Sequence, residues 1–359
     1  MVAREVRRIE ELGPSVVIER PPGALPKSPL AKVVDRANLY LHARRIAYRE
    51  VASGRVLVVH HVGPCGEQSP SLIGSLPVPL VYGPLPAARL TGSTNDEWLS
   101  WLHAADATAV QASLSKLVAG PAGLAAHWLW RRTMRHANAI SIEAEANVTV
   151  KTPNVVVIPP GVDVQQFVPR SSVQPAAGRV IAVGKLLGRK RYDDLIRAIS
   201  LVQRAYPTTH LVLVGSGPQE TSLRLLANQL GIGSSITFAG SVPRAELLKL
   251  LHSAEVFCHP AELDTFPLAV LEAMASGIPT VVSSAGALPE IVGSAGLVHE
   301  VGNEVDLARQ LTRVVSSEGF KHSLGVAARA RVLERFTWQA MCNAYLDLYR
   351  RTALRPSGW

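Results

Sequence analysis

Residues Cys258 to Glu290 read CHPAELDTFPLAVLEAMASGIPTVVSSAGALPE, and the rest of the chain can be arranged around this stretch. Its apolar start is typical of a covered parallel strand that ends at His259. Pro267 is expected to be the first residue of a helix, because proline lacks an N–H that a helix start leaves unpaired. Gly277 is expected to end that helix before a second strand begins.

Two carboxylates flank the start of this predicted helix. Asp264 lies just ahead of it and Glu272 lies within it. Such a pair could bracket a ligand whose anionic part rests on the backbone N–H groups of the helix start. Alternatively, Asp264 only caps the helix and Glu272 is a solvated helix former. The pattern alone does not choose between these interpretations.

Composition limits the class of protein. With 359 residues, 47% hydrophobic and 18% charged, the chain fits a soluble globular protein with two domains. The formal net charge of +9 favours anionic partners such as nucleotides, phosphorylated lipids, nucleic acid or a membrane surface, without choosing among them.

Cysteine usage and the absence of long apolar segments indicate a cytoplasmic protein. Cys65, Cys258 and Cys342 are far apart and form no CxxC pair, so no disulfide framework or zinc site is expected. No apolar segment is long enough to span a bilayer, and the N-terminal residues MVAREVRRIEELG lack the apolar core of a secretory signal.

The pattern breaks into Pro, Ser and Gly around Val168 to Gly178, which predicts a domain boundary. We therefore expect an N-terminal domain over residues 1–168, a second domain over 169–335 and a terminal helix over 336–359. In the second domain, strands and helices alternate, which predicts a parallel doubly wound sheet with ligand sites outside the carboxyl ends of its strands. Its predicted strands are Val180–Val183, Leu211–Val214, Ile236–Phe238, Val256–His259, Thr280–Ser283 and Gly296–His299, and its helices begin near Asp193, Pro218, Arg244 and Pro267.

The flanking segments carry further predicted elements. Strands are expected in the first domain at Arg55–His61, Val78–Gly83, Ala139–Ile142 and Val155–Ile158. The tail, Asp306–Arg351, reads as three helices, with Thr337 as N-cap of the last. Ala31–Ala52 is a basic helix that fits a packed amphipathic element better than one lying on an anionic membrane.

Polar groups follow several predicted strands of the second domain. Lys185 and Lys190 flank a glycine turn, Gly215 and Gly217 open a tight turn, and Val242 follows the third strand. Each feature alone is compatible with an ordinary loop, but together at one sheet edge they predict a nucleotide-sized pocket. In the first domain, His60 and His61 end a strand, and because side chains alternate, only one can face a cleft.

These motifs resemble a known family. VIPPGVD at Val157–Asp163, AVGKLLGRKR, LVLVGSGP, ITFAGSVP and DTFPLAVLEAMASGIPTVVSS are similar, in order, to the nucleotide-sugar-binding half of retaining GT-B glycosyltransferases of the family 4 type, with their E-x7-E element. The resemblance implies an α/β fold in which two Rossmann-like domains face each other across a cleft. It also implies a last helix that crosses back to the first domain.

The resemblance assigns roles to residues of this sequence. It implies that Lys185 and Lys190 hold the donor diphosphate and that Asp264 positions the donor sugar, so these three form the expected catalytic group. Glu272 would grip the nucleotide ribose. Further donor contacts are expected at Gly184, Gly215, Gly217, Val242, Thr265, Phe266, Pro267 and Leu268, and acceptor-side contacts at His60 and His61. Helix N–H groups would neutralise the diphosphate, so neither a metal nor a cofactor other than the donor is expected.

The sequence also departs from the family pattern. Asp264 is shorter than the usual glutamate, Lys185 replaces the commoner arginine, and Pro267 removes an N–H. The family opens with a strand and a glycine-rich loop, whereas this chain opens with a predicted helix. We therefore expect either a late start of the gene model or an incomplete N-terminal domain.

The expected function is transfer of a sugar, with retention, from a nucleoside diphosphate sugar to a polysaccharide, glycolipid or glycoprotein acceptor. We expect it in the cytoplasm, with peripheral contact at the inner face of the membrane and without nucleic acid as a partner. The alternative is a non-catalytic, N-terminally shortened GT-B protein that binds a nucleotide sugar or a partner. A GT-B epimerase is disfavoured, because the element from DTFPL to LEAM is similar to that of transferases.

Overall fold

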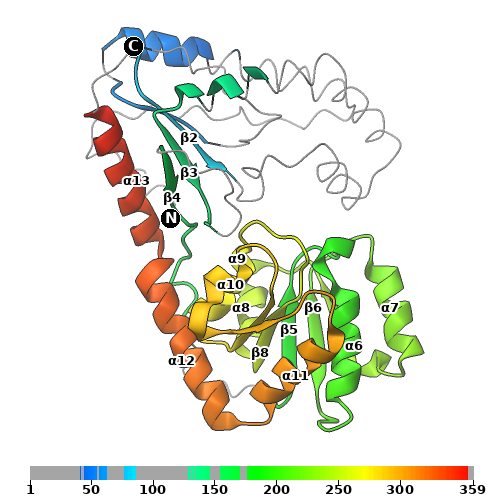
Figure 1. Cartoon of the computed structure of the whole chain (residues 1–359). Helices are drawn as coiled ribbons and strands as arrows, with labels where there is room; N and C mark the ends of the chain where they lie inside the picture. Colours follow the sequence, from blue (N-terminus) through cyan, green and yellow to red (C-terminus); the bar gives the residue numbers. More distant parts are fainter. Residues whose placement is uncertain are drawn as a thin grey trace.

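The structure is a computed structural model, and it describes residues 41, 44–54, 56–62, 77–85, 128–129, 131–133, 135–145, 154–169 and 176–354. Figure 1 shows two α/β parts, one above the other, joined along one side by the last two long helices. Of the predicted basic helix over 31–52, residues 41 and 44–52 are helical, and residues 31–40 and 42–43 lie outside the described residues.

The second part is built on a parallel six-stranded sheet in the order β10-β9-β8-β5-β6-β7. Its strands are β5 (Arg179–Val183), β6 (His210–Val214), β7 (Ile236–Gly240), β8 (Val256–His259), β9 (Thr280–Ser283) and β10 (Leu297–His299). All six predicted strands of this domain are therefore present, within two residues at each end. The chain starts in the middle of the sheet, winds to one edge and then returns to wind to the other.

Helices cover both faces of this sheet, as the apolar strands require. They are α6 (Tyr192–Val202), α7 (Glu220–Gln229), α8 (Arg244–His252), α9 (Leu268–Ala275), α10 (Leu288–Val292), α11 (Glu304–Val315) and α12 (Glu318–Arg335). Alternation along β5 divides the core, because Val180 and Ala182 pack with α6, α7 and α11, whereas Ile181 packs with α9, α10 and α12.

The first part contains a parallel four-stranded sheet in the order β1-β2-β3-β4. Its strands are β1 (Val59–His61), β2 (Leu80–Leu85), β3 (Ala139–Ile142) and β4 (Val155–Val157). One face buries Tyr82, Ile140 and Ile142, and the other buries Val81 and Ala139. The expected α/β class and its two parallel sheets are thus confirmed.

The terminal helix α13 (Trp338–Ala353) returns to the first part (Figure 1). Thr337 caps it, since its side chain accepts a hydrogen bond from the N–H of Ala340 at 3.0 Å. Leu348, with Met341 and Tyr345 beside it, packs against Val81 of the N-terminal sheet. The predicted N-cap and the predicted crossing of the last helix are both confirmed.

Several predicted element boundaries were wrong. Helix α9 begins at Leu268, and Pro267 is its N-cap, with φ −75° and ψ 109°. The φ of Pro267 suits a helix, but its ψ is extended, so its peptide has not yet entered the helix. Helix α7 begins at Glu220, because Pro218 and Gln219 form a turn first.

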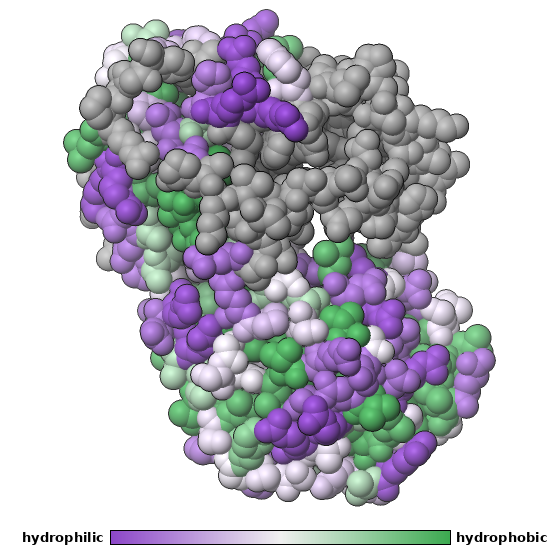
Figure 2. All heavy atoms as spheres, viewed as in Figure 1, coloured by the Kyte–Doolittle hydropathy of each residue, from purple (hydrophilic) through white to green (hydrophobic). Residues whose placement is uncertain are grey.

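No helix in the described part of the chain is both long and apolar enough to cross a membrane. On the face seen in Figure 2, hydrophobic residues of the C-terminal part are scattered among hydrophilic ones. A peripheral membrane contact therefore stays a prediction.

Candidate active site

The site forms where the winding of the C-terminal sheet changes direction. Strands β5 and β8 are neighbours, but the chain leaves β5 toward β6 and leaves β8 toward β9. In a parallel sheet of this kind, the loops after such strands diverge and leave a crevice at their carboxyl ends. The loops that meet here are 184–191 and 260–267, which contain most of the predicted donor site.

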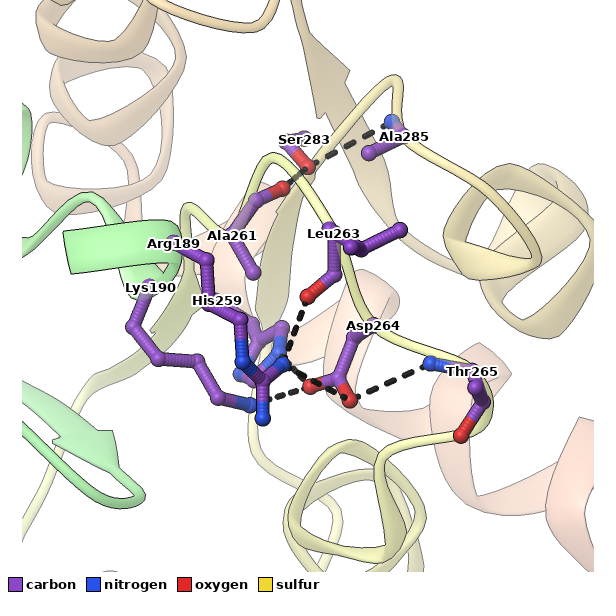
Figure 3. Close-up of polar contacts among 9 residues, drawn as sticks. All are labelled: Arg189, Lys190, His259, Ala261, Leu263, Asp264, Thr265, Ser283 and Ala285. Carbon is purple, nitrogen blue, oxygen red and sulfur yellow. Dashed lines mark hydrogen bonds and ion pairs between the residues drawn. The ribbon is translucent and has the colours of Figure 1, made fainter. Parts of the chain in front are cut away.

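Asp264 is the centre of a buried polar cluster (Figure 3). Its Oδ2 accepts hydrogen bonds from Lys190 Nζ and from His259 Nε2, the latter at 2.9 Å. Its Oδ1 accepts the N–H of Thr265 at 3.2 Å. Lys190 belongs to the short 3-10 turn Gly188–Lys190, and His259 is the last residue of β8. The structure therefore brings together two predicted residues, Lys190 and Asp264, across 74 residues of sequence.

The cluster holds Asp264 ionised. Burial opposes the charge, but the hydrogen bond from His259 and the charge of Lys190 outweigh it, so the pKa of Asp264 lies below its ordinary value. Burial lowers the pKa of His259, so the ring is neutral and donates its Nε2–H to the carboxylate. The result is a fixed, charged carboxylate in the loop that follows β8.

Arg189 is a cation of this cluster that the sequence analysis did not single out. Its guanidinium donates to the carbonyl oxygen of Leu263 at 2.8 Å and lies 3.9 Å from Asp264 Oδ1. The sequence likewise indicated His259 only as the end of a strand. The available signals were the position of Arg189 in the same turn as Lys190 and the position of His259 at a strand exit.

The loop that carries Asp264 is anchored at its other end as well (Figure 3). The hydroxyl of Ser283, the last residue of β9, donates to the carbonyl oxygen of Ala261. With Arg189 bonded to Leu263, two separate elements therefore hold the loop backbone. This support limits how far Asp264 can move from Lys190.

Glu272 forms a second polar centre. It is buried on α9, and Arg244, the first residue of α8, donates to its Oε1 at 3.0 Å. Arg244 also donates to Gln166 Oε1 at 3.2 Å and lies over the Phe167 ring. Burial raises the pKa of Glu272 although Arg244 opposes the shift. The interpretation of Glu272 as a merely solvated helix former is wrong.

The other predicted donor residues surround these two centres. Lys185 is exposed and belongs to neither centre. Thr265, Phe266 and Pro267 lead into α9, whose first residue, Leu268, is exposed. Val242 is half-buried after β7, and beside it Ser241 Oγ lies 3.0 Å from Ser216 Oγ. Their contact with a donor stays a prediction.

The predicted glycines have a packing role in this structure. A Cβ at Gly215, where φ is +130°, would lie 2.0 Å from the carbonyl oxygen of Gly184. A Cβ at Gly217 would lie 2.4 Å from the carbonyl oxygen of Leu186. The loops after β5 and β6 therefore approach more closely than any side chain allows. A donor contact at Gly184, Gly215 or Gly217 would come in addition to this packing.

The two predicted acceptor-side histidines lie in different surroundings. His60 Nδ1 is 2.7 Å from Tyr349 Oη and its Nε2 is 3.1 Å from the carbonyl oxygen of Gly83, so it connects α13 to the sheet. His61 is buried edge-on against Tyr82. Burial lowers the pKa of each histidine to about 4. Both rings are therefore neutral at physiological pH.

Two further features lie outside the Asp264 cluster. A hollow of about 490 Å³ opens between α6 and α7, lined by Arg191, Arg197 and Glu262 among others, and it includes none of Lys190, Asp264 or Glu272. In the described residues, no three His, Cys, Asp or Glu side chains gather as a metal-binding group.

Comparison with known proteins identifies the family that the C-terminal part resembles. The family model of glycosyl transferases group 1 matches residues 168–331. These residues form a group 1 glycosyltransferase domain. The match contains the whole six-stranded sheet, together with Lys190, Asp264 and Glu272.

Curated proteins similar to this domain include mannosyltransferases. A GDP-mannose-dependent monoacylated alpha-(1-6)-phosphatidylinositol monomannoside mannosyltransferase of Corynebacterium glutamicum is 29% identical over 203 residues, or 51% of this chain and 53% of the relative. A GDP-mannose-dependent alpha-(1-6)-phosphatidylinositol monomannoside mannosyltransferase of Mycolicibacterium smegmatis is 32% identical over 200 residues, or 51% and 52%. The chain thus spans about half the length of the curated relatives it matches.

Solved structures show that the likeness in fold extends beyond the group 1 domain. The crystal structure of Anabaena Alr3699/HepE in complex with UDP has a TM-score of 0.67 and 16% sequence identity, over 88% of this chain and 82% of that one. The GT-B fold expected from the sequence is thereby confirmed. The exact domain boundaries stay a prediction.

Proposed function

We propose that this chain is a glycosyltransferase that moves a sugar from a nucleoside diphosphate sugar to a glycan or lipid-linked acceptor. The observation that carries the proposal is the Asp264 cluster, which lies at the switch point of a group 1 glycosyltransferase sheet. Ligands of doubly wound sheets bind at this edge. The cluster is largely buried, charged and fixed by hydrogen bonds that connect the loop after β5 to the loop after β8.

The charges of the cluster suit a reaction that releases a diphosphate. When the anomeric bond breaks, negative charge develops on the departing nucleoside diphosphate, and positive groups fixed nearby stabilise it. Arg189 and Lys190 supply two positive charges to the single negative charge of Asp264, so the cluster keeps a net positive charge. The start of α9, which has no side-chain cap, adds the positive end of a helix dipole.

The donor would lie along the loops of the C-terminal sheet. Asp264 would accept hydrogen bonds from the sugar, Glu272 from the ribose, and Lys185 with Lys190 would bind the diphosphate. Because relatives are GDP-mannose-dependent and the HepE structure contains UDP, guanosine and uridine diphosphate sugars are the first donors to test. The transfer would retain the anomeric configuration and need no metal or further cofactor.

The acceptor would bind between the two domains. His60 and His61 stay the expected acceptor-side contacts, and His60 would have to contact an acceptor while its Nδ1 bonds to Tyr349 and its Nε2 to Gly83. Relatives named for phosphatidylinositol mannosides favour a lipid-linked acceptor, reached from the cytoplasmic face of the membrane. Nucleic acid is not an expected partner.

The test is a donor panel of UDP-, GDP- and ADP-sugars, with hydrolysis and transfer both measured on the full chain. The expected result is turnover of one donor that is lost in Lys190→Ala and Glu272→Ala. Wild-type activity in both variants would refute the assigned roles. Binding of a nucleotide sugar, seen as a higher melting temperature, without turnover would instead favour the non-catalytic alternative.

A further inference from the structure

Glu143 lies where the two domains meet. It directly follows Ile142, the last residue of β3, a central strand of the N-terminal sheet. Its neighbour Ala144 is fully buried in the same core cluster as Phe266 and Leu288 of the C-terminal domain. The N–H of Glu145 donates to Glu290 Oε2 on α10 at 3.1 Å. The loop after β3 is therefore packed against the donor-binding domain.

Glu143 is half-buried, and one oxygen of its carboxyl group is buried without a structural partner in the described part of the chain. Its Oε2 is buried and makes no hydrogen bond within the described residues. Burial, with the charge of Asp264 in addition, raises its pKa to about 7. A buried carboxyl oxygen without a hydrogen bond lowers the stability of a fold, so packing alone gives no reason for a glutamate here.

The effect of Asp264 connects Glu143 to the cluster across the two domains. Asp264 is the charged residue that acts on the Glu143 carboxyl, and Lys190, His259 and Arg189 in turn hold Asp264. The two carboxyl groups differ in state, since Asp264 is ionised and accepts hydrogen bonds, whereas Glu143 below about pH 7 is protonated and has a proton that it could donate to a ligand. Sugar hydroxyls both donate and accept, so such a pair suits them.

We propose that Glu143 is a further sugar-binding residue, whose carboxyl group hydrogen-bonds a hydroxyl of the donor sugar held between β3 and Asp264. The inference rests on the proposed function and adds a contact from the N-terminal domain. It gives the buried Oε2 of Glu143 a hydrogen-bond partner. Glu143 is not among the residues that the sequence motifs indicated.

The test compares two ligands on the full chain: the nucleoside diphosphate sugar that binds best and the same nucleoside diphosphate without sugar. Glu143→Ala is expected to weaken binding of the nucleotide sugar about tenfold and to leave binding of the nucleoside diphosphate unchanged. Glu143→Gln, which keeps a hydrogen-bond donor of the same size, is expected to stay near wild type at about pH 6. Glu145→Gln, an exposed carboxylate two residues away, is the matched control.

The pH dependence separates a sugar contact from a structural effect. As pH rises through about 7, the wild-type chain is expected to lose sugar-dependent affinity, because Glu143 loses its proton, whereas Glu143→Gln is not. Equal weakening of both ligands in Glu143→Ala, or no weakening, would overturn the inference while the proposed function stands. If the wild-type chain binds no nucleotide sugar, the proposed function itself fails and the inference fails with it.

Discussion

Arg244 donates a hydrogen bond to Glu272 across 3.0 Å, so the carboxylate expected to bind the ribose already has a cationic partner. Arg244 begins α8, and Glu272 lies within α9. The guanidinium is half-exposed while the carboxylate is buried, with exposed side-chain fractions of 48% and 11%. An arriving ribose would therefore meet a carboxylate whose position Arg244 has set.

The first prediction concerns this pair. Arg244→Met should lower the free energy of unfolding by about 1 kcal/mol at neutral pH, because Glu272 would be left buried and charged without its cationic partner. The loss stays this small because Arg244 is half-exposed and solvent already weakens the ion pair. Burial already raises the pKa of Glu272, so the loss should grow as pH rises through that pKa and vanish at low pH. Denaturant unfolding in a wild-type and a Glu272→Gln background measures it. An equal loss in both backgrounds would show that the pair is not its source.

The second prediction concerns Asp264. Asp264→Asn should abolish transfer and lower the free energy of unfolding by about 3 kcal/mol at neutral pH, because Lys190 would stay buried without a counter-charge. The pKa of Asp264 is lowered in the folded chain, so its stabilisation is present above the unfolded pKa of about 3.9 and lost as pH falls below it. Stability curves at several pH values measure this.

The matched control for Asp264 is Glu262→Gln on the same loop. Glu262 is exposed and its ion pair with Arg191 is loose, at 3.6 Å. The control should change stability by no more than about 0.5 kcal/mol. A similar loss in both variants would mean that the loop tolerates no change, and would contradict a specific role for the Asp264 cluster.

The third prediction separates the two lysines. Lys185 is exposed, so Lys185→Ala should weaken nucleoside diphosphate binding about tenfold and leave the melting temperature unchanged. Lys190 is the buried partner of Asp264, so Lys190→Ala should weaken nucleoside diphosphate binding and also lower the melting temperature. Calorimetric titration and thermal unfolding of the two variants measure this. Unchanged affinity in Lys185→Ala would remove Lys185 from the donor site.

The fourth prediction concerns Gly215. Gly215→Ala should lower the free energy of unfolding by about 3 kcal/mol or more, because the added Cβ meets the carbonyl oxygen of Gly184 and the residue has a φ of +130°. Gly188→Ala is the control, since a Cβ there has nothing within 4 Å. Chemical denaturation of both proteins measures it. Equal stability of the two variants would show that the loops after β5 and β6 can move apart.

Much of the C-terminal domain was predictable because its signals are local. Apolar runs, with glycine and proline between them, located all six strands, and Thr337 located the start of α13. Helix starts were less accurate where proline was involved: Pro267 was expected inside α9 and lies before it. The residue type was suitable for both positions, so the sequence could not distinguish them.

The partners of the site residues were not predictable. The sequence indicated Lys190 and Asp264 separately, and the two residues are 74 positions apart in the chain. Their contact depends on β5 and β8 being neighbours in the sheet. His60 shows the same limit, since its bond to Tyr349 spans 289 residues. Spacing along the chain carries no information about contacts this distant.

The sequence by itself determined the alternation of strands and helices, and hence the edge of the C-terminal sheet at which polar groups gather, because these follow from local periodicity and turn residues. Only the tertiary structure decided that His259 and Lys190 hold Asp264, that Arg244 holds Glu272, and that the loop after β3, which carries Glu143, packs against the C-terminal domain. These relationships depend on strand order and on packing between domains, through which burial and neighbouring charges set the protonation state of each group.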